Sequence, residues 1–226
     1  MTSNKEDYLK VIYEGGGLER PVPNKEIAQA LGVAPASVSE MLTKLNQQGL
    51  IVYGSYKGSR LTEAGLASCM DVVRSHELWE VFLIRHLGYT WREAHEDAHL
   101  LEHVASSRMI DRLDNFLKHP QTCPHGSLIP QNGRIPESEG FNRLSDLSAG
   151  ETAMICRVLE DGTLLDYLER RGLKIHETIQ LLSIDDYEGP VSFILEGRTI
   201  NISFKAATQI FVKRLSGPAK EDYDGS

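Results

Sequence analysis

The sequence lacks long apolar runs, contains few cysteines and carries no excess of positive charge. No stretch of its 226 residues approaches the roughly 20 consecutive apolar residues that span a bilayer, so we expect no membrane partner. Residues 1–7 contain acids and no apolar core, which predicts that they are not a signal peptide. The cysteines are odd in number and far apart, which argues against a disulfide framework and favours the reducing cytoplasm: Cys69, Cys123 and Cys156.

The formal net charge of −8 is unusual for a protein that binds nucleic acid, but it is unevenly distributed. Residues 1–65 contain seven Lys and Arg against seven Asp and Glu, so most of the acid excess lies beyond residue 65. Acidity is therefore no strong argument against DNA binding by the first third of the chain. A hydrophobic content of 41% and a charged fraction of 25% are typical of globular proteins, and the length allows one large domain or two to three small ones.

Histidine and glutamate gather in one short stretch, residues 95–103. Four of them have the spacing i, i+4, i+7 and i+8, which places them on one face of a helix: His95, His99, Glu102 and His103. A second pair, His76 and Glu80, lies one helical turn apart on an earlier segment. Any one of these residues could simply belong to a solvated helix face. Six in phase on two neighbouring helices predict a site for a divalent metal, because imidazole and carboxylate are its usual ligands.

The same stretch also spells His-Glu-x-x-His with His95, Glu96 and His99, the signature of zinc hydrolases. In those enzymes the two histidines bind zinc, the glutamate polarises a water molecule, and one coordination position stays open. Glu102 and His103 crowd the same face here. A ligand set this full favours a sensor, in which the metal ties segments together, over a hydrolase.

The first third of the chain has the order of elements of a winged helix-turn-helix. A first helix is predicted from Lys5 to the Gly15-Gly16-Gly17 breaker. A second helix, capped by Asn24, covers residues 25–31, and a third begins at Pro35 and ends near Gln48. The segments around residues 54–58 then form a hairpin, or wing. The alternative is a helical bundle with an incidental hairpin.

In a helix-turn-helix protein the third helix enters the major groove and a wing contacts phosphates. Small side chains at the start of that helix would allow close approach to base edges, and basic side chains would contact the backbone. The residues predicted to contact DNA are Lys25, Ala36, Ser37, Ser39, Glu40, Lys44, Lys57 and Arg60.

The middle of the chain is helical. One long helix follows Thr62 and Glu63 and carries His76 and Glu80. Thr90 with Glu93 forms a capping box for the next helix, and Ser106 or Ser107 caps a third. Apolar residues in that third helix form either a dimer seam or ordinary intrachain core: Met109, Ile110, Leu113, Phe116 and Leu117. Palindromic DNA would favour a twofold dimer.

After the helices, Cys123 and His125 stand two apart in a loop and can chelate one metal ion, whereas Cys69 and Cys156 lie in apolar segments and are expected in the core. From Leu144 the pattern changes to five short alternating runs interrupted by a helix over 164–170, which predicts a small barrel-like β domain. The predicted division is 1–64 DNA-binding domain, 65–126 helical metal-binding and dimerisation domain, 127–143 linker, 144–216 β domain and 217–226 tail.

The chain resembles the DtxR/MntR family of metal-dependent transcriptional repressors over nearly its whole length, with the strongest likeness to the manganese-responsive ScaR/SloR branch. The resemblance rests on Asn4-Lys5-Glu6-Asp7-Tyr8-Leu9-Lys10, Val38-Ser39-Glu40-Met41, His76-Glu77-Leu78, Leu101-Glu102-His103 and Thr122-Cys123-Pro124-His125-Gly126. It implies a mainly α protein with a small β domain: an N-terminal winged helix-turn-helix, a helical dimerisation domain and a C-terminal SH3-like (FeoA-like) barrel.

The resemblance also implies two metal sites in each subunit. The first would use Glu80, Cys123, His125 and Glu160, with His76 and His95 nearby. The second would use Asp7, His99, Glu102 and His103, with His76 available to either site. Metal bound by Asp7, on the first helix, would fix the winged helix relative to the dimer core.

Two positions depart from the family pattern. Position 99 is His, where manganese members usually have Glu and iron members have Cys, and Lys10 replaces the acid that completes a binuclear pair in some manganese members, although the ScaR branch also has Lys. Mn(II) is the expected ion, but His99 and Cys123 leave Fe(II) and Zn(II) open.

The expected function is a cytoplasmic repressor, not an enzyme, that binds an inverted-repeat operator as a metal-loaded homodimer and controls metal uptake genes. The alternatives are a zinc metallohydrolase built on residues 95–99 and a DNA-binding regulator that senses a small organic ligand.

Overall fold

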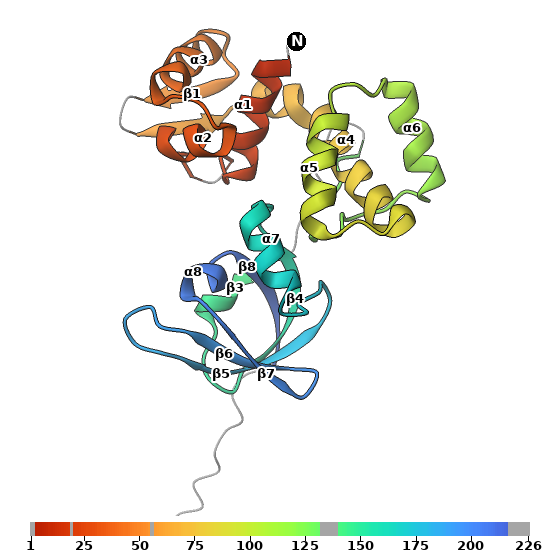
Figure 1. Ribbon diagram of the computed structural model, residues 1–226. Helices are drawn as coiled ribbons and strands as arrows, with labels where there is room; N and C mark the ends of the chain where they lie inside the picture. Colours follow the sequence, from red (N-terminus) through yellow and green to blue (C-terminus); the bar gives the residue numbers. More distant parts are fainter. Residues whose placement is uncertain (1–2, 19, 55–56, 132–139, 217–226) are drawn as a thin grey trace, which may run out of the picture. The chain divides into compact units, whose positions relative to one another are not determined.

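In the computed structural model, residues 3–18, 20–54, 57–131 and 140–216 are described (Figure 1). They fall into two compact units. Among the described residues, the first comprises those within 3–83, 96–121 and 128–131, and the second comprises those within 84–95, 122–127 and 140–216.

The first unit begins with a winged helix-turn-helix, as the sequence predicted. Its helices are α1 (Ser3–Glu14), α2 (Asn24–Leu31) and α3 (Pro35–Gln47), and its wing is the antiparallel pair β1 (Ile51–Gly54) and β2 (Gly58–Leu61). Gly32 ends α2 in the left-handed conformation with φ 63°, which costs glycine little. Residues 55 and 56, at the tip of the predicted wing, lie outside the described residues.

The expected helix cap at Asn24 was wrong. Pro23, with extended backbone angles, occupies the N-cap position of α2, and Asn24 is the first helical residue. The Asn24 amide instead donates to the Ser39 hydroxyl at 3.2 Å and to the Tyr53 hydroxyl at 3.1 Å. These two bonds connect α2 to α3 and to the wing, so the side chain fixes how the helix-turn-helix packs.

The apolar stripes of the three helices meet in one core. Val38, Leu42 and Leu45 of α3 are fully buried, together with Leu9 and Ile12 of α1. The core also takes in residues from the first turns of α4 (Glu63–Leu87): Cys69, Met70 and Val73. Cys69 is therefore a core residue, as predicted, and burial raises the pKa of its thiol to about 12. Because α4 starts inside this core, its orientation is tied to the winged helix.

Helix α5 (Trp91–Leu101) begins with the predicted capping box, in which the Thr90 backbone donates to the Glu93 carboxylate at 2.9 Å. Helix α6 (Ser107–Phe116) is capped by Ser106, whose hydroxyl accepts from the Met109 backbone.

The five apolar residues proposed for a dimer seam differ in how far they are buried. Met109 and Phe116 are 50% and 59% exposed, Leu113 is intermediate, and Ile110 and Leu117 are buried. The exposed pair is available to a partner, whereas Ile110 and Leu117 belong to the intrachain core.

The second unit contains an antiparallel sheet in the order β3-β8-β4-β5-β6-β7. Its strands are β3 (Asn142–Arg143), β4 (Thr152–Val158), β5 (Thr178–Ile184), β6 (Val191–Leu195), β7 (Arg198–Ile202) and β8 (Ile210–Ser216). A 3₁₀ turn (Leu144–Asp146), α7 (Gly162–Glu169) and α8 (Phe204–Ala207) complete it. The prediction of five strands was one short, because β3 has two residues and shows no alternation that sequence reading can detect.

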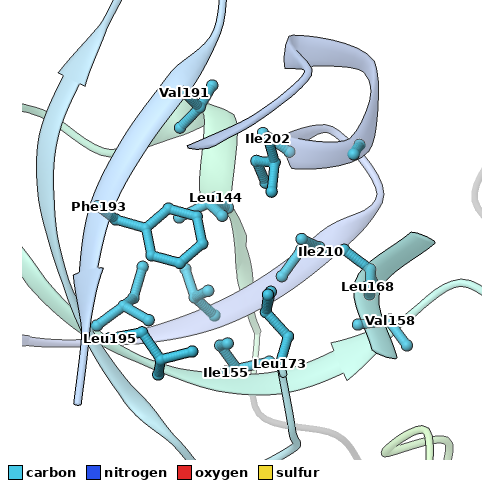
Figure 2. Packing of buried hydrophobic residues seen from close by; sticks show 14 of the residues in the cluster. Leu144, Ile155, Val158, Leu168, Leu173, Val191, Phe193, Leu195, Ile202 and Ile210 are labelled. Atoms are coloured by element: carbon cyan, nitrogen blue, oxygen red, sulfur yellow. The ribbon is translucent and has the colours of Figure 1, made fainter. Parts of the chain in front are cut away.

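The core of this unit lies on one face of the sheet, beneath α7 and α8. Figure 2 shows the Phe193 ring pointing into that core, where Leu195, Ile155 and Ile210 also point. Alternating burial along β6, with Val191, Phe193 and Leu195 all inward, is the period-two pattern of a half-buried strand. Cys156, on β4, is buried as predicted.

The remaining segments bear on the predicted linker and tail. Residues 132–139, within the predicted linker, and residues 217–226, the predicted tail, lie outside the described residues. Across the described part of the chain, which includes all three cysteines, no disulfide forms and no helix is long and apolar enough to cross a bilayer.

Candidate metal centre

Glu102 is the centre of the side-chain cluster in the first unit. Its backbone N–H donates to the Ala98 carbonyl at 2.9 Å, which continues α5 by one residue and keeps Glu102 in phase with the histidines of that helix. The side chain is fully buried. Its Oε1 atom lies 3.1 Å from His99 Nδ1 and 3.2 Å from His103 Nε2. Three of the four residues predicted to share a helical face, His99, Glu102 and His103, therefore converge on one carboxylate, whereas His95 lies in the other cluster.

Asp7 of α1 joins this cluster from the winged helix. Its Oδ1 atom is 2.6 Å from His103 Nε2. Asp7, Glu102 and His103 each offer one atom, and these three atoms lie within 4.8 Å of one another, as do those of His76, His99 and Glu102. Glu102 is common to both groups, so the other three residues predicted for this site, Asp7, His99 and His103, lie around its carboxylate.

The close atoms of this cluster do not satisfy one another. Asp7 Oδ1, Glu102 Oε1 and both ring nitrogens of His103 are buried and make no hydrogen bond with any described residue, although the contacts are short. Buried polar atoms almost always have a hydrogen-bond partner. Acceptors that converge without partners fit a cation better than they fit each other, so these residues suit a divalent ion.

On the opposite side of Glu102, cations already compensate the carboxylate. Its Oε2 atom is 2.6 Å from both Lys10 Nζ and His76 Nδ1, and His76 Nε2 is 3.0 Å from Glu80 Oε1. Burial and the Lys10 charge lower the pKa of His76, but Glu80 and Glu102 outweigh them and raise it to about 10. Burial likewise opposes ionisation of Glu102, yet contacts with His76 and His99 and the Lys10 charge hold its pKa below the usual range.

The second unit holds the other candidate cluster. Cys123, His125 and Glu160 each offer a ligand atom, all within 4.8 Å of one another. A tight turn sets this arrangement: the Cys123 N–H donates to the Ser127 carbonyl, and the His125 N–H donates to Cys123 Sγ at 3.3 Å. Glu160 follows β4 closely, and its Oε1 atom accepts from the Ser127 hydroxyl at 2.6 Å.

Gly126 is required inside this turn. Its φ is +87°, and a Cβ atom there would lie 2.0 Å from the Cys156 carbonyl oxygen. The His125 carbonyl accepts from the Val158 N–H at 2.9 Å, so the turn is bound along the end of β4. The Trp91 ring meets the His125 ring edge-on at 5.3 Å between centroids, which restricts the orientation of the imidazole.

Two further residues predicted as ligands, His95 and Glu80, belong to different units. His95 belongs to the second unit, and one of its ring nitrogens lies within 4.8 Å of a Glu160 oxygen. Glu80 belongs to the first unit, where it pairs with His76, so its share in the Cys123 site stays a prediction.

The predicted DNA-contacting residues gather on the winged helix. All are exposed except Ser39, which is half-buried and donates to the Pro35 carbonyl. Glu40 and Lys44 pair at 2.6 Å on the outer face of α3, and Arg60 of the wing donates to the Leu18 carbonyl at 2.7 Å.

Sequence reasoning missed two residues of the clusters. Lys10 was noted only as a departure from a family pattern, and nothing in its spacing shows that it pairs with Glu102, because 92 residues separate them. Ser127, which holds Glu160, stands next to the noted Cys-Pro-His-Gly turn, but a lone serine gives no signal.

A winged helix whose first helix contributes Asp7 to a buried cluster of histidine and carboxylate defines the class of a metal-controlled DNA-binding regulator. Comparison with known proteins agrees. Residues 1–59 match the model described as iron dependent repressor, N-terminal DNA binding domain, and residues 62–131 match the metal binding and dimerisation domain of the same family. Residues 142–214 match the FeoA domain.

Individual relatives point the same way. The iron-dependent repressor IdeR of Mycobacterium tuberculosis is 31% identical over 169 residues, covering 71% of this chain and 74% of IdeR. The crystal structure of ScaR with bound zinc is 40% identical with a TM-score of 0.81, covering 94% of this chain and all of that one. The structure of the manganese regulator SloR is 38% identical, also with a TM-score of 0.81. The match covers 95% of this chain and all of the SloR chain.

The chain belongs to the DtxR/MntR family of metal-dependent transcriptional repressors. It is a transcriptional regulator and not an enzyme, so the His-Glu-x-x-His match at residues 95–99 does not mark a hydrolase. SH3-like architecture of the C-terminal sheet accords with the FeoA match.

Cys123 provides a direct test of the second cluster. If its thiolate binds a metal ion, saturating metal should slow alkylation of Cys123 at least about tenfold, because the thiolate is the reactive species and the metal occupies it. Mass spectrometry can measure alkylation at each cysteine, and Cys69, buried in the winged-helix core, is the internal control. Equal protection of Cys69 and Cys123, or none at either, would exclude Cys123 as a ligand.

Proposed function

We propose that this protein is a cytoplasmic repressor that binds an inverted-repeat operator as a homodimer when it is loaded with a divalent metal, Mn(II) foremost. The genes that it controls are those for metal uptake. The observation that carries the proposal is the convergence of Asp7, from the winged helix, with Glu102 and His103, which directly follow α5. Metal at this point would join the DNA-binding elements to the helices that follow them.

The mechanism is a shift between two populations. Without metal, the facing atoms of Asp7, Glu102 and His103 stay unsatisfied, so this side of the contact adds little to holding α1 against the segment that follows α5. An ion held by these residues would favour the arrangement in which both recognition helices of a dimer meet consecutive major grooves. A coupling of about 2–3 kcal/mol would change DNA affinity by about 30- to 150-fold.

The choice of metal rests on the donor atoms. Asp7 and Glu102 supply the hard oxygens that manganese accepts, whereas His99 and Cys123 are softer and suit iron or zinc. Among the relatives, IdeR is named as iron-dependent, SloR as a manganese regulator, and ScaR has been solved with zinc. We infer that Mn(II) is the physiological ion and that Fe(II) or Zn(II) can also fill the sites.

Exposed apolar side chains on α5, α6 and the turn between them support a homodimer. Leu100 is 70% exposed and Val104 is 76% exposed, and the exposed faces of Met109 and Phe116 follow them in the chain. Large apolar side chains gathered on a few turns of helix are typical of an interface. A twofold dimer would match an inverted-repeat operator.

A binding experiment tests this function. Duplexes selected from a random library by the metal-loaded protein are titrated with protein at buffered free Mn(II), Fe(II) and Zn(II), with fluorescence anisotropy as the readout. The selected sites should contain an inverted repeat, and binding should require metal. Equal affinity in the presence of a chelator would contradict the proposal and favour a regulator that senses an organic ligand.

His99 is expected to set the metal preference. His99→Glu makes the cluster around Glu102 one charge more negative and harder, so activation of DNA binding should shift toward Mn(II) by about tenfold relative to Zn(II). His86→Glu makes the same change on an exposed histidine outside both clusters and should leave the preference unchanged. If His99→Ala binds operator DNA at the same free-metal concentration as the parent, position 99 is not a working ligand.

The wing and the third helix should differ in what they contribute. Lys57→Ala and Arg60→Ala should weaken binding to operator and random DNA alike, and each should reduce the slope of log affinity against log salt by about 1, because phosphate contacts release counterions. Ser37→Leu should weaken operator binding more than random binding.

Lys205→Ala, the same charge change on α8, is the control and should alter neither property. If Lys57→Ala, Arg60→Ala and Ser37→Leu each weaken binding to operator and random DNA equally, the roles assigned to the third helix and the wing are wrong.

A further inference from the structure

Lys10 is a buried cation inside the cluster of the first unit. Its side chain is 3% exposed, and its ammonium nitrogen lies 2.6 Å from Glu102 Oε2 and 3.6 Å from Glu14 Oε1. A buried lysine loses the hydration of its charge and persists where carboxylates compensate it. The pair therefore joins α1, in the winged helix, to the residue that follows α5.

The two oxygens of Glu102 have different surroundings. Oε2 is saturated by Lys10 and by His76 Nδ1, both at 2.6 Å. Oε1 lies near His99 and His103 but makes no hydrogen bond with a described residue. An incoming divalent ion would thus share a single carboxylate with an ammonium group that is already in place.

The ion pair and the metal would also join the same two segments. Lys10 and Asp7 are one helical turn apart on α1, and Glu102 and His103 are the two residues directly after α5. Lys10 connects the segments without metal, and Asp7 would connect them through metal.

We propose, on the basis of the function above, that Lys10 is a resident counter-ion that sets the metal concentration at which the protein responds. Its charge opposes the divalent ion at Glu102, and its contact with Glu102 holds α1 against α5 when metal is absent.

Two consequences of opposite sign follow for a variant without this charge. The metal-free protein becomes less stable, because Glu102 stays buried with one cation fewer. The metal binds more tightly, because it no longer meets the ammonium group and relieves an uncompensated carboxylate. A lysine with a merely structural role would lower stability and leave metal affinity unchanged or weaker.

Lys10→Met tests the proposal, because methionine keeps the apolar stem and removes the charge. The full chain is titrated with Mn²⁺ alone, and electron paramagnetic resonance measures the free ion. The event assigned to this site is the one that Asp7→Asn removes. We expect the dissociation constant of that event to fall by about tenfold or more, and the metal-free melting temperature to fall as well.

Two matched variants complete the test. Lys5→Met removes the same charge from a half-buried position on α1 outside the cluster, where Lys5 donates to Gln48, and should leave both quantities near the parent values. Lys10→Arg keeps the charge and should bind Mn²⁺ no more tightly than the parent. Lys10→Gln replaces Lys10→Met if the latter does not fold, with the same expected result.

The outcomes separate the two proposals. If Asp7→Asn removes no binding event, the site itself is wrong. If it does remove one, and the uncharged Lys10 variant binds Mn²⁺ as weakly as the parent or more weakly, Lys10 is only a structural ion pair and the inference is overturned.

Discussion

The buried carboxylate of Glu102 is the constraint on which the arrangement of the first unit depends. A buried anion must be compensated where it stands, and here the compensation comes from different helices: Lys10 on α1 and His76 on α4. Three segments that are far apart in sequence therefore meet at one point. The same point offers open ligand atoms from Asp7 and His103, so the residue that organises the packing is also the one through which metal can alter it.

Most of the fold could be predicted from local patterns, because periodicity and chain breakers act over a few residues. The helix from Pro35, the hairpin after it and the box at Thr90 and Glu93 all follow from such rules. The failures have tertiary causes. Asn24 does not cap α2, because its side chain donates instead to the hydroxyls of Ser39 and Tyr53, which are distant in sequence. The two-residue strand β3 forms by pairing with β8.

The candidate site likewise has residues that the sequence pattern predicts and others that it does not. Helical spacing alone brings His99, Glu102 and His103 to one face, since all three belong to one stretch of chain. Spacing could not supply Asp7 or Glu160, which were expected only from a family resemblance, and it gave no sign of the Lys10 contact with Glu102. Contacts of this kind depend on how helices pack, which no window of sequence contains. A buried charge of one sign is nevertheless a reason to look for its partner.

The two clusters also show why ligand chemistry alone does not select a metal. Zinc outcompetes manganese at nearly any set of nitrogen, oxygen and sulfur ligands, so stronger ligands at Cys123 or His99 would favour zinc further. A repulsive charge acts differently. The Lys10 ammonium group opposes every divalent ion to the same degree, because Coulomb repulsion depends on charge and distance and not on the softness of the ion. It lowers all affinities together, which leaves the order of affinities unchanged but brings occupancy into the range where the supply of each ion decides which one is bound.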